Sequence, residues 1–130
     1  MTNVPNDLRY TAEHEWVSVI DTSTIRFGIT DYAQDALGDI VFVSLPGLGS
    51  SITAGQTCGE VESTKSVSDI YAPVSGTISA RNEGIETAPE MLNSDPYVKG
   101  WIADVSVAGD AKEAIAGLLD SAAYLALISA

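Results

Sequence analysis

Short apolar stretches separated by turn residues make up most of this 130-residue chain. Alternation of apolar and polar residues with a period of two predicts half-buried β-strands. Residues 14–20 and 24–29 form the first predicted hairpin, because the residues between them are of turn-forming types. Further strands are predicted at 40–43, 58–62, 67–71, from Gly76 onward and within 100–107. The pattern therefore predicts a mainly β fold, two layers of strands with short helices at the margins.

One short helix is predicted directly after the first hairpin. Thr30 can cap a helix over Asp31–Leu37, and Gly38 lies just past its end, where a left-handed backbone is needed. The apolar run 40–43 follows without a polar position inside it. Such a run predicts a buried strand.

The C-terminal residues carry the second helical pattern. Asp110 is suited to cap a helix that has Glu113 in its first turn, and apolar residues recur on one face at Ile115, Leu118, Leu119 and Ala122. A helical segment is therefore predicted over about residues 110–128, with a possible second start near Asp120. Its apolar end is too short to span a bilayer, which takes about 20 residues, and is expected to pack against the sheet.

Length and charge restrict the kinds of partner. A chain of this length predicts a single domain over residues 1–130. Six basic against eighteen acidic residues give a net charge of −12, which argues against nucleic acid or anionic membrane and favours partners with basic docking faces. The first ten residues lack the basic and apolar regions of a signal peptide and the arginines of a transit peptide, so a cytoplasmic location is expected.

The residues that commonly build active sites are scarce. One cysteine, Cys58, and one histidine, His14, leave too few ligands for a zinc site, and Cys58 is expected to be a small buried residue. His14 lies beside no nucleophile motif, and glycine-rich phosphate loops are absent. We therefore expect a protein that is not an enzyme, in which His14 is structural or lines a cleft.

Lys65 is the candidate functional residue of the chain. It is the sole basic residue between Arg26 and Arg81, and two predicted strands flank it, so it lies at or beside the tip of a hairpin spanning about residues 58–71. A primary amine at such a tip is accessible to an acylating enzyme. A lysine in a turn is, however, far more often a plain solvated residue, and this segment alone favours that interpretation.

Several motifs in fixed order extend this interpretation to about residues 8–127. They are His14-Glu15-Trp16-Val17, the run Gly28 to Gln34, Leu37 to Val43, the hairpin GEVESTKSVSDIYAPVSG, Asn93 to Tyr97, and Gly100-Trp101. In this order and spacing the chain resembles the H-protein of the glycine cleavage system. The resemblance implies a flattened, two-layer barrel-sandwich hybrid of the lipoyl/biotinyl-carrier type with a C-terminal helix.

The resemblance also implies a cofactor and a set of partners. Lipoic acid would be joined to Lys65 through an amide, and its dithiolane would perform the chemistry. The lipoylated protein would accept an aminomethyl group from glycine decarboxylase, a pyridoxal-phosphate enzyme. It would then present that group to the aminomethyltransferase and be reoxidised by dihydrolipoamide dehydrogenase. A lipoate ligase or a lipoyl/octanoyl transferase would load it, and a monomer is expected because the hairpin must face several enzymes in turn.

Five further residues receive roles from the same resemblance. Glu62, Thr64, Ser66 and Asp69 flank the lysine and are expected to be read by the lipoylating enzyme. Glu15 and Asp69 match positions of a surface cleft that shelters the loaded arm. Carboxylates at these positions would pair with the ammonium group at its end.

Three alternatives share parts of this pattern. A biotin carrier has a similar hairpin but flanks its lysine with methionines, whereas Thr64 and Ser66 stand here. A lipoyl domain of a 2-oxoacid dehydrogenase is shorter and lacks both the His-Glu-Trp hairpin and the terminal helix. A protein that mainly relays lipoyl groups to other carriers stays open, because the attachment chemistry is the same.

Overall fold

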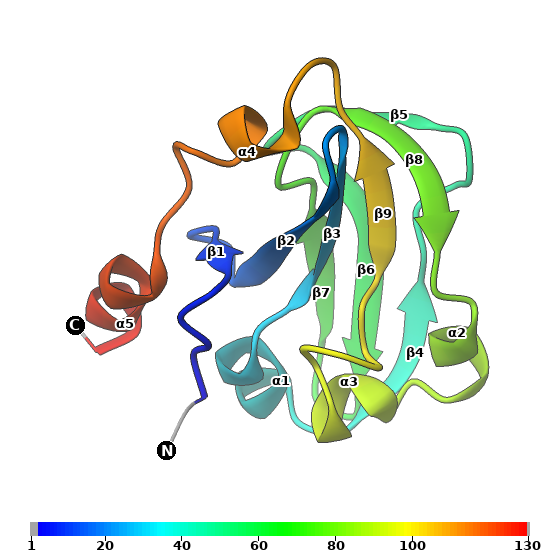
Figure 1. Ribbon diagram of the computed structural model, residues 1–130. Coiled ribbons are helices and arrows are strands. Elements are labelled where there is room, and N and C mark those ends of the chain that lie inside the picture. Colours follow the sequence, from blue (N-terminus) through cyan, green and yellow to red (C-terminus); the bar gives the residue numbers. More distant parts are fainter. Residues whose placement is uncertain (1–2, 130) are drawn as a thin grey trace.

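The computed structural model describes residues 3–129, which form two antiparallel sheets that do not close into a barrel (Figure 1). The six-stranded sheet has the order β1-β2-β3-β9-β8-β5, and the three-stranded sheet has the order β4-β6-β7. The strands are β1 (Arg9–Tyr10), β2 (Glu15–Asp21), β3 (Thr24–Ile29), β4 (Ile40–Ser44), β5 (Ser51–Ile52), β6 (Thr57–Ser63), β7 (Val67–Tyr71), β8 (Gly76–Arg81) and β9 (Ala103–Ser106). The helices are α1 (Asp31–Leu37), α2 (Gly84–Thr87), α3 (Met91–Ser94), α4 (Ala111–Ala114) and α5 (Ser121–Ser129). The predicted mainly β architecture in two layers is confirmed.

The main core lies between the two sheets. Alternate residues of β2 and β3 point inward from the larger sheet, and those of β6 and β7 meet them from the smaller one. Fully or almost fully buried members of this cluster include Val17, Ile25, Phe27, Val61 and Ile70. Figure 1 shows the smaller sheet lying across the back of β2, β3 and β9. The hairpin of β6 and β7 is therefore anchored in the core by its inward face.

Helix α1 begins and ends as its sequence predicts. The Thr30 hydroxyl accepts a hydrogen bond from the Ala33 amide at 3.1 Å. At the other end the amide of Gly38 donates to the Gln34 carbonyl at 3.0 Å, and Gly38 has a φ of 81°. Residues with a side chain rarely adopt that φ, so a glycine is favoured at this position.

Strand β4 corrects one prediction. Ile40 and Val43 are buried, but Val41 and Phe42 are about half exposed. Ile40 pairs with Ser63 and Phe42 pairs with Glu62, so Val41 is an extra residue in a β-bulge. A bulge interrupts the two-residue alternation, and here it turns two successive apolar side chains to the solvent. The expectation of a fully buried strand was wrong for these two residues.

The C-terminal segment is two short helices, not one. Asp110 caps α4, as predicted, by accepting from the Lys112 amide at 2.8 Å. The second helix begins at Ser121, with the Asp120 carboxylate accepting from the Ala123 amide at 2.9 Å. Of the α5 side chains only Tyr124 is buried, and Leu125 and Leu127 are both exposed. The expectation that this apolar end packs against the sheet therefore holds for Tyr124 and, in part, for Ile128, which is partly buried beside it.

Tyr124 belongs to a second, smaller cluster with Tyr10 and Trp16. The rings of Tyr10 and Tyr124 stack with centroids 4.7 Å apart. Tyr10 and Leu119 exchange two backbone hydrogen bonds of 2.8 and 2.9 Å, which fasten the link between α4 and α5 to the edge of the larger sheet. Within residues 3–129, none of the helices has the length and apolarity needed to cross a membrane.

Candidate functional site

Lys65 lies at the tip of the β6–β7 hairpin and is exposed. The register pairs Glu60 with Asp69 and Glu62 with Val67. Beyond that pair the Ser63 amide donates to the Ser66 carbonyl at 2.8 Å and closes the turn. The predicted position of the lysine is therefore confirmed, and its side chain projects from the end of a strand pair that the core holds in place.

The turn is organised by a residue that sequence reasoning missed. The Ser63 side chain is almost completely buried, and its hydroxyl accepts from the amides of Lys65 at 3.2 Å and Ser66 at 3.1 Å. The same hydroxyl is 3.2 Å from the Ser66 carbonyl, to which it donates. Serine commonly bonds to the backbone two or three residues ahead in turns, which was the available signal. Ser63 thus fixes the backbone from which Lys65 projects.

The junction between α1 and β4 supports the tip from its other side. The Thr64 amide donates to the Asp39 carbonyl at 3.1 Å. A Cβ atom added at Gly38 would lie 3.1 Å from Cε of Lys65, which is closer than most real Cβ contacts. A glycine is therefore favoured at position 38 for two reasons: the backbone has a positive φ, and a larger side chain would crowd the side chain of Lys65.

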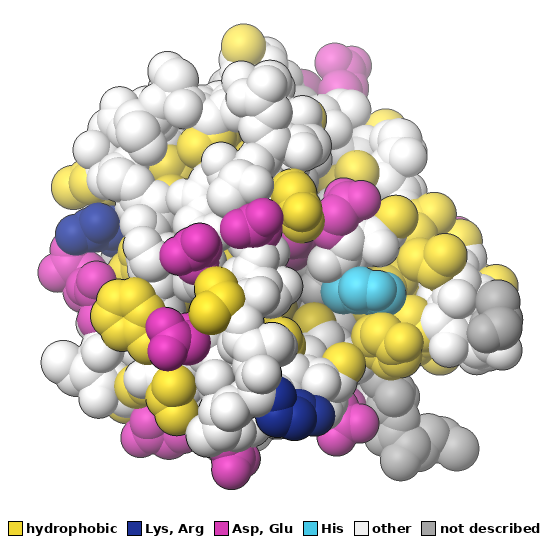
Figure 2. Space-filling view, turned by 180° about the vertical axis from the view of Figure 1, so that it is seen from behind, with side chains coloured by type: hydrophobic (Ala, Val, Ile, Leu, Met, Phe, Trp, Pro, Cys, Tyr) yellow, Lys and Arg dark blue, Asp and Glu magenta, His cyan; other side chains and the backbone are white. Residues whose placement is uncertain are grey.

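The residues expected to be read by a lipoylating enzyme surround this tip. Glu62, Thr64, Ser66 and Asp69 are all exposed. Strands β4, β6 and β7 contain no lysine or arginine. Figure 2, a view from the back of the molecule, shows acidic and hydrophobic side chains next to one another on that surface. Glu62, Thr64 and Ser66 thus lie next to Lys65, and Asp69 lies further down β7, where it pairs with Glu60 on the same acidic surface.

Glu15 has a different environment from the one expected for a residue lining a surface cleft. Its side chain is 2% exposed, and its two carboxylate oxygens accept from the Thr11 hydroxyl at 2.8 Å and the Tyr71 amide at 3.1 Å. Burial raises the pKa of this carboxyl from an ordinary 4.5 to about 7, although both hydrogen bonds oppose the rise. Asp69 is exposed and lies two residues before Tyr71 on the same strand. The two acids therefore differ in environment: Glu15 is buried next to the end of β7, whereas Asp69 is part of β7 and faces the solvent.

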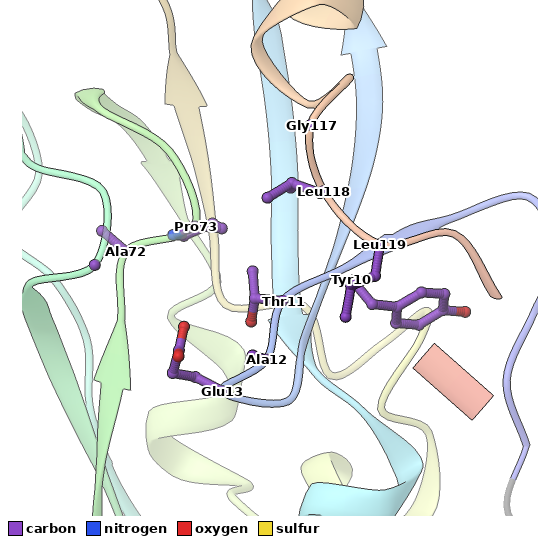
Figure 3. A pocket seen from close by; sticks show the side chains of 10 residues that line it. Tyr10, Thr11, Ala12, Glu13, Ala72, Pro73, Gly117, Leu118 and Leu119 are labelled. Atoms are coloured by element: carbon purple, nitrogen blue, oxygen red, sulfur yellow. The ribbon is translucent and has the colours of Figure 1, made fainter. Parts of the chain in front are cut away.

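A pocket lies just beyond the end of β7 (Figure 3). Its lining comprises Tyr10, Thr11, Ala12, Glu13, Gly55, Ala72, Pro73, Gly117, Leu118 and Leu119. Thr11 is the hydrogen-bond partner of Glu15, and Ala72 follows Tyr71. Figure 3 shows the Glu13 side chain between Thr11 and the Ala72–Pro73 turn. The lining does not include Lys65, Glu15 or Asp69, so the pocket adjoins the predicted cleft residues without containing them.

His14 and Cys58 both contact residues that hold the fold together. His14 has a φ of 71°, and its Nδ1 is 2.9 Å from the Tyr124 hydroxyl, which is also 2.8 Å from the Thr30 hydroxyl. Burial lowers the pKa of His14. Cys58 is half-buried against the core, and burial raises the pKa of its thiol to about 12. In the part of the chain that the structure describes, no group of three or more His, Cys, Asp or Glu residues is arranged to hold a metal ion.

Comparison with known proteins assigns the chain to a family. Residues 8–130 match the family described as glycine cleavage H-protein. The chain is 58% identical over 126 residues to the glycine cleavage system H protein of Mycobacterium avium, covering 95% of this chain and 96% of that protein. It is 54% identical over 130 residues to the one from Mycolicibacterium smegmatis, covering 99% of each.

A solved structure agrees with these sequence comparisons. The crystal structure of the glycine cleavage system H protein from Mycobacterium marinum superposes with a TM-score of 0.87 at 39% identity, covering 98% of this chain and 100% of that one. The similarity thus spans the sequence, both sheets and the hairpin that presents Lys65. The chain belongs to the glycine cleavage H-protein family, the lipoyl carriers of the glycine cleavage system, which are carrier components and not enzymes.

Proposed function

We propose that Lys65 is the residue that carries lipoate, through an amide between its Nζ atom and the lipoyl carboxyl group. The observation that supports this is the placement of one exposed primary amine at a hairpin tip whose backbone Ser63 holds from beneath. Lys99 and Lys112 lie instead in a loop and in helix α4. When bound, the dithiolane of lipoate supplies the group that accepts and releases the one-carbon amine unit and its electrons.

We infer that the partners are the enzymes of the glycine cleavage cycle. They are glycine decarboxylase, the aminomethyltransferase and dihydrolipoamide dehydrogenase, with a lipoate ligase or a lipoyl/octanoyl transferase as the loading enzyme. The exposed hairpin and the net charge of −12 support docking on basic surfaces. These partners would place the protein in the cytoplasm. The exposed Glu62, Thr64, Ser66 and Asp69 would be read when Lys65 is acylated.

We further propose that the loaded arm lies back along β7, toward Asp69 and Glu15. Strand β7 is an edge strand of its sheet, so no further strand pairs with its outer side. Asp69 and Tyr71 follow Lys65 by four and six residues, so their Cα atoms lie at most about 13 and 20 Å from that of Lys65. The Glu15 carboxylate lies at the Tyr71 amide, and the pocket adjoins it. An ammonium group at the end of the arm would meet two acids there, and a partly desolvated ion pair is stronger than an exposed one.

Lipoylation of the purified protein tests the attachment site. Incubation with lipoate ligase, ATP and lipoate should add one lipoyl group, and peptide mapping should place it on Lys65. Lys65→Arg should remain unmodified because a guanidinium offers no free amine, and its free energy of unfolding should change by less than about 0.5 kcal/mol. Modification of Lys99 or Lys112 in the wild type would contradict the assignment.

A second measurement tests the carrier role itself. The lipoylated protein, mixed with glycine decarboxylase and labelled bicarbonate, should support exchange of label into glycine. Lys65→Arg is the matched negative control. Complete lipoylation without any exchange would instead favour a protein that relays lipoyl groups to other carriers.

A further inference from the structure

Three hydrophobic side chains stand in solvent beside the attachment turn. Val41, Phe42 and Val67, which we call the tip patch, are 50%, 53% and 59% exposed. Phe42 pairs with Glu62, and Glu62 pairs with Val67, so Phe42 and Val67 flank Glu62 in a row on one face of the three strands. With neighbouring strands about 4.8 Å apart, the row is about 10 Å wide. Lys65 precedes Val67 by two residues, which places the row directly below the lysine.

The exposure of the tip patch results from a specific backbone feature. The bulge at Val41 turns both Val41 and Phe42 outward, while their neighbours Ile40 and Val43 stay in the core. Large exposed apolar side chains that gather beside a functional residue mark an interaction surface, and bulges commonly re-aim side chains at such sites. We propose that the tip patch is the docking surface for the enzyme that acylates Lys65. This proposal rests on the proposed attachment of lipoate at that residue.

The reach of the unmodified lysine favours the acylating enzyme over the other partners. The Nζ atom of a lysine extends roughly 6 Å from its Cα, so an enzyme that brings an acyl donor to it must seat against the residues around the turn. The Lys65 side chain lies over Gly38, at the junction that leads directly into β4. Enzymes that act on the far end of a lipoyl arm can stand away from the hairpin by the length of that arm. The short reach of the lysine therefore favours contact between the acylating enzyme and the residues next to the turn, the tip patch among them.

The surrounding charge defines the surface that would fit. Exposed carboxylates surround the tip patch, from Asp39, Glu60, Glu62 and Asp69. Among the residues of β4, β6 and β7 there is no basic side chain to balance them. A complementary enzyme would present a shallow apolar socket with arginine or lysine at its rim, as is common where a few anchors are enclosed by polar contacts. The patch supplies the apolar anchors, and the acids orient the approach.

Steady-state lipoylation of substituted proteins tests this proposal. Phe42→Thr and Val67→Thr keep a residue suited to strands while removing the apolar contact. With purified lipoate ligase, ATP and lipoate, Phe42→Thr should raise the KM for the protein about tenfold and leave kcat within about twofold, because docking and not chemistry is weakened. Phe42→Leu keeps an apolar side chain, so its KM should stay close to that of the wild type. Leu48→Thr is the matched control, since Leu48 is 62% exposed on the loop after β4.

The outcomes separate this inference from the proposed function. If the wild type is not acylated at Lys65, the attachment assignment itself fails. If the wild type is acylated and both tip-patch variants have the KM of Leu48→Thr, with thermal unfolding unchanged, the docking proposal is overturned. It is also overturned if fully lipoylated Phe42→Thr loses glycine–bicarbonate exchange with glycine decarboxylase as strongly as it loses acylation, because the patch would then serve an enzyme that uses the arm.

Discussion

The carboxylate of Glu15 accepts a hydrogen bond from the backbone amide of Tyr71 at 3.1 Å and so joins strand β2 to strand β7. These strands belong to different sheets. The Glu15 carboxyl group that joins them is titratable. Its other oxygen accepts a hydrogen bond from the Thr11 hydroxyl. The hairpin that carries Lys65 is therefore tied to the rest of the molecule by a buried acid.

The stability of the protein should depend on pH through Glu15. Because burial raises the pKa of Glu15 to about 7, the folded state holds this proton more tightly than the unfolded chain. Its stabilising contribution is thus complete below about pH 4.5 and declines until about pH 7, by about 3 kcal/mol in total. Urea unfolding of wild type and Glu15→Gln across this range should show a difference that changes with pH. The same change at exposed Glu60 is the control, and a pH-independent difference at Glu15 would contradict the prediction.

Glu15 and Asp69 should also protect the loaded arm if they face its ammonium group. In protein that has first been fully lipoylated and then loaded with the aminomethyl group, Glu15→Gln combined with Asp69→Asn should speed the spontaneous release of formaldehyde. Asp69→Asn alone separates the exposed acid from the buried one. Glu113→Gln, an exposed acid on α4, is the control. Equal release rates from the double variant and the wild type would leave the two acids without a protective role.

Ser63→Ala should loosen the attachment turn. The amides of Lys65 and Ser66 would lose their common acceptor, at a cost of about 1 kcal/mol because water can partly replace it at an exposed tip. Hydrogen exchange at these two amides should become faster, and kcat/KM for lipoylation should fall. Ser66→Ala removes a neighbouring hydroxyl that makes no hydrogen bond within the described residues. Identical exchange rates in the two variants would show that Ser63 does not order the turn.

Tyr124→Phe should weaken the attachment of helix α5. Its buried hydroxyl lies within hydrogen-bonding distance of both His14 Nδ1 and the Thr30 hydroxyl, so its removal should cost about 1–3 kcal/mol. Tyr32→Phe is the matched control, because that ring also lies against His14 but its hydroxyl has no partner among the described residues. Denaturant unfolding measures both. Equal losses in the two variants would contradict a role for the Tyr124 hydroxyl.

Local patterns in the sequence predicted much of the fold. The first hairpin, the capped helix α1 and the hairpin around Lys65 each depend on neighbouring residues, namely turn formers, a Thr30 cap and alternating apolar positions. Residues 40–43 show the limit of local patterns, because the exposure of Val41 and Phe42 was not predicted from them. A bulge depends on how one strand pairs with another, and the sequence of β4 alone does not record that pairing.

The site shows the same division. The position of Lys65 and its acidic surroundings follow from local sequence, and the family resemblance supplied the lipoyl chemistry. The burial of Glu15 depends on the packing of two sheets, and that packing separates Glu15 from solvated Asp69. Ser63 was missed because its role depends on the folded turn, which brings the amides of Lys65 and Ser66 within hydrogen-bonding distance of its hydroxyl. The second helix start near Asp120 was indicated by local sequence, whereas the pairing of Leu119 with distant Tyr10, which lies between α4 and α5, was not.

That pairing has a consequence for the order in which the chain acquires its structure. Strand β1 is the outermost strand of its sheet, and the backbone of Leu119 covers its free edge. During synthesis Leu119 and Tyr124 emerge only after every strand has been made. Until then β1 offers unpaired amides and carbonyls, together with the uncovered ring of Tyr10, to any other chain nearby. Leu119 and the helix that follows it thus close an edge that is open to aggregation in shorter nascent chains, including those in which the Lys65 hairpin has already formed.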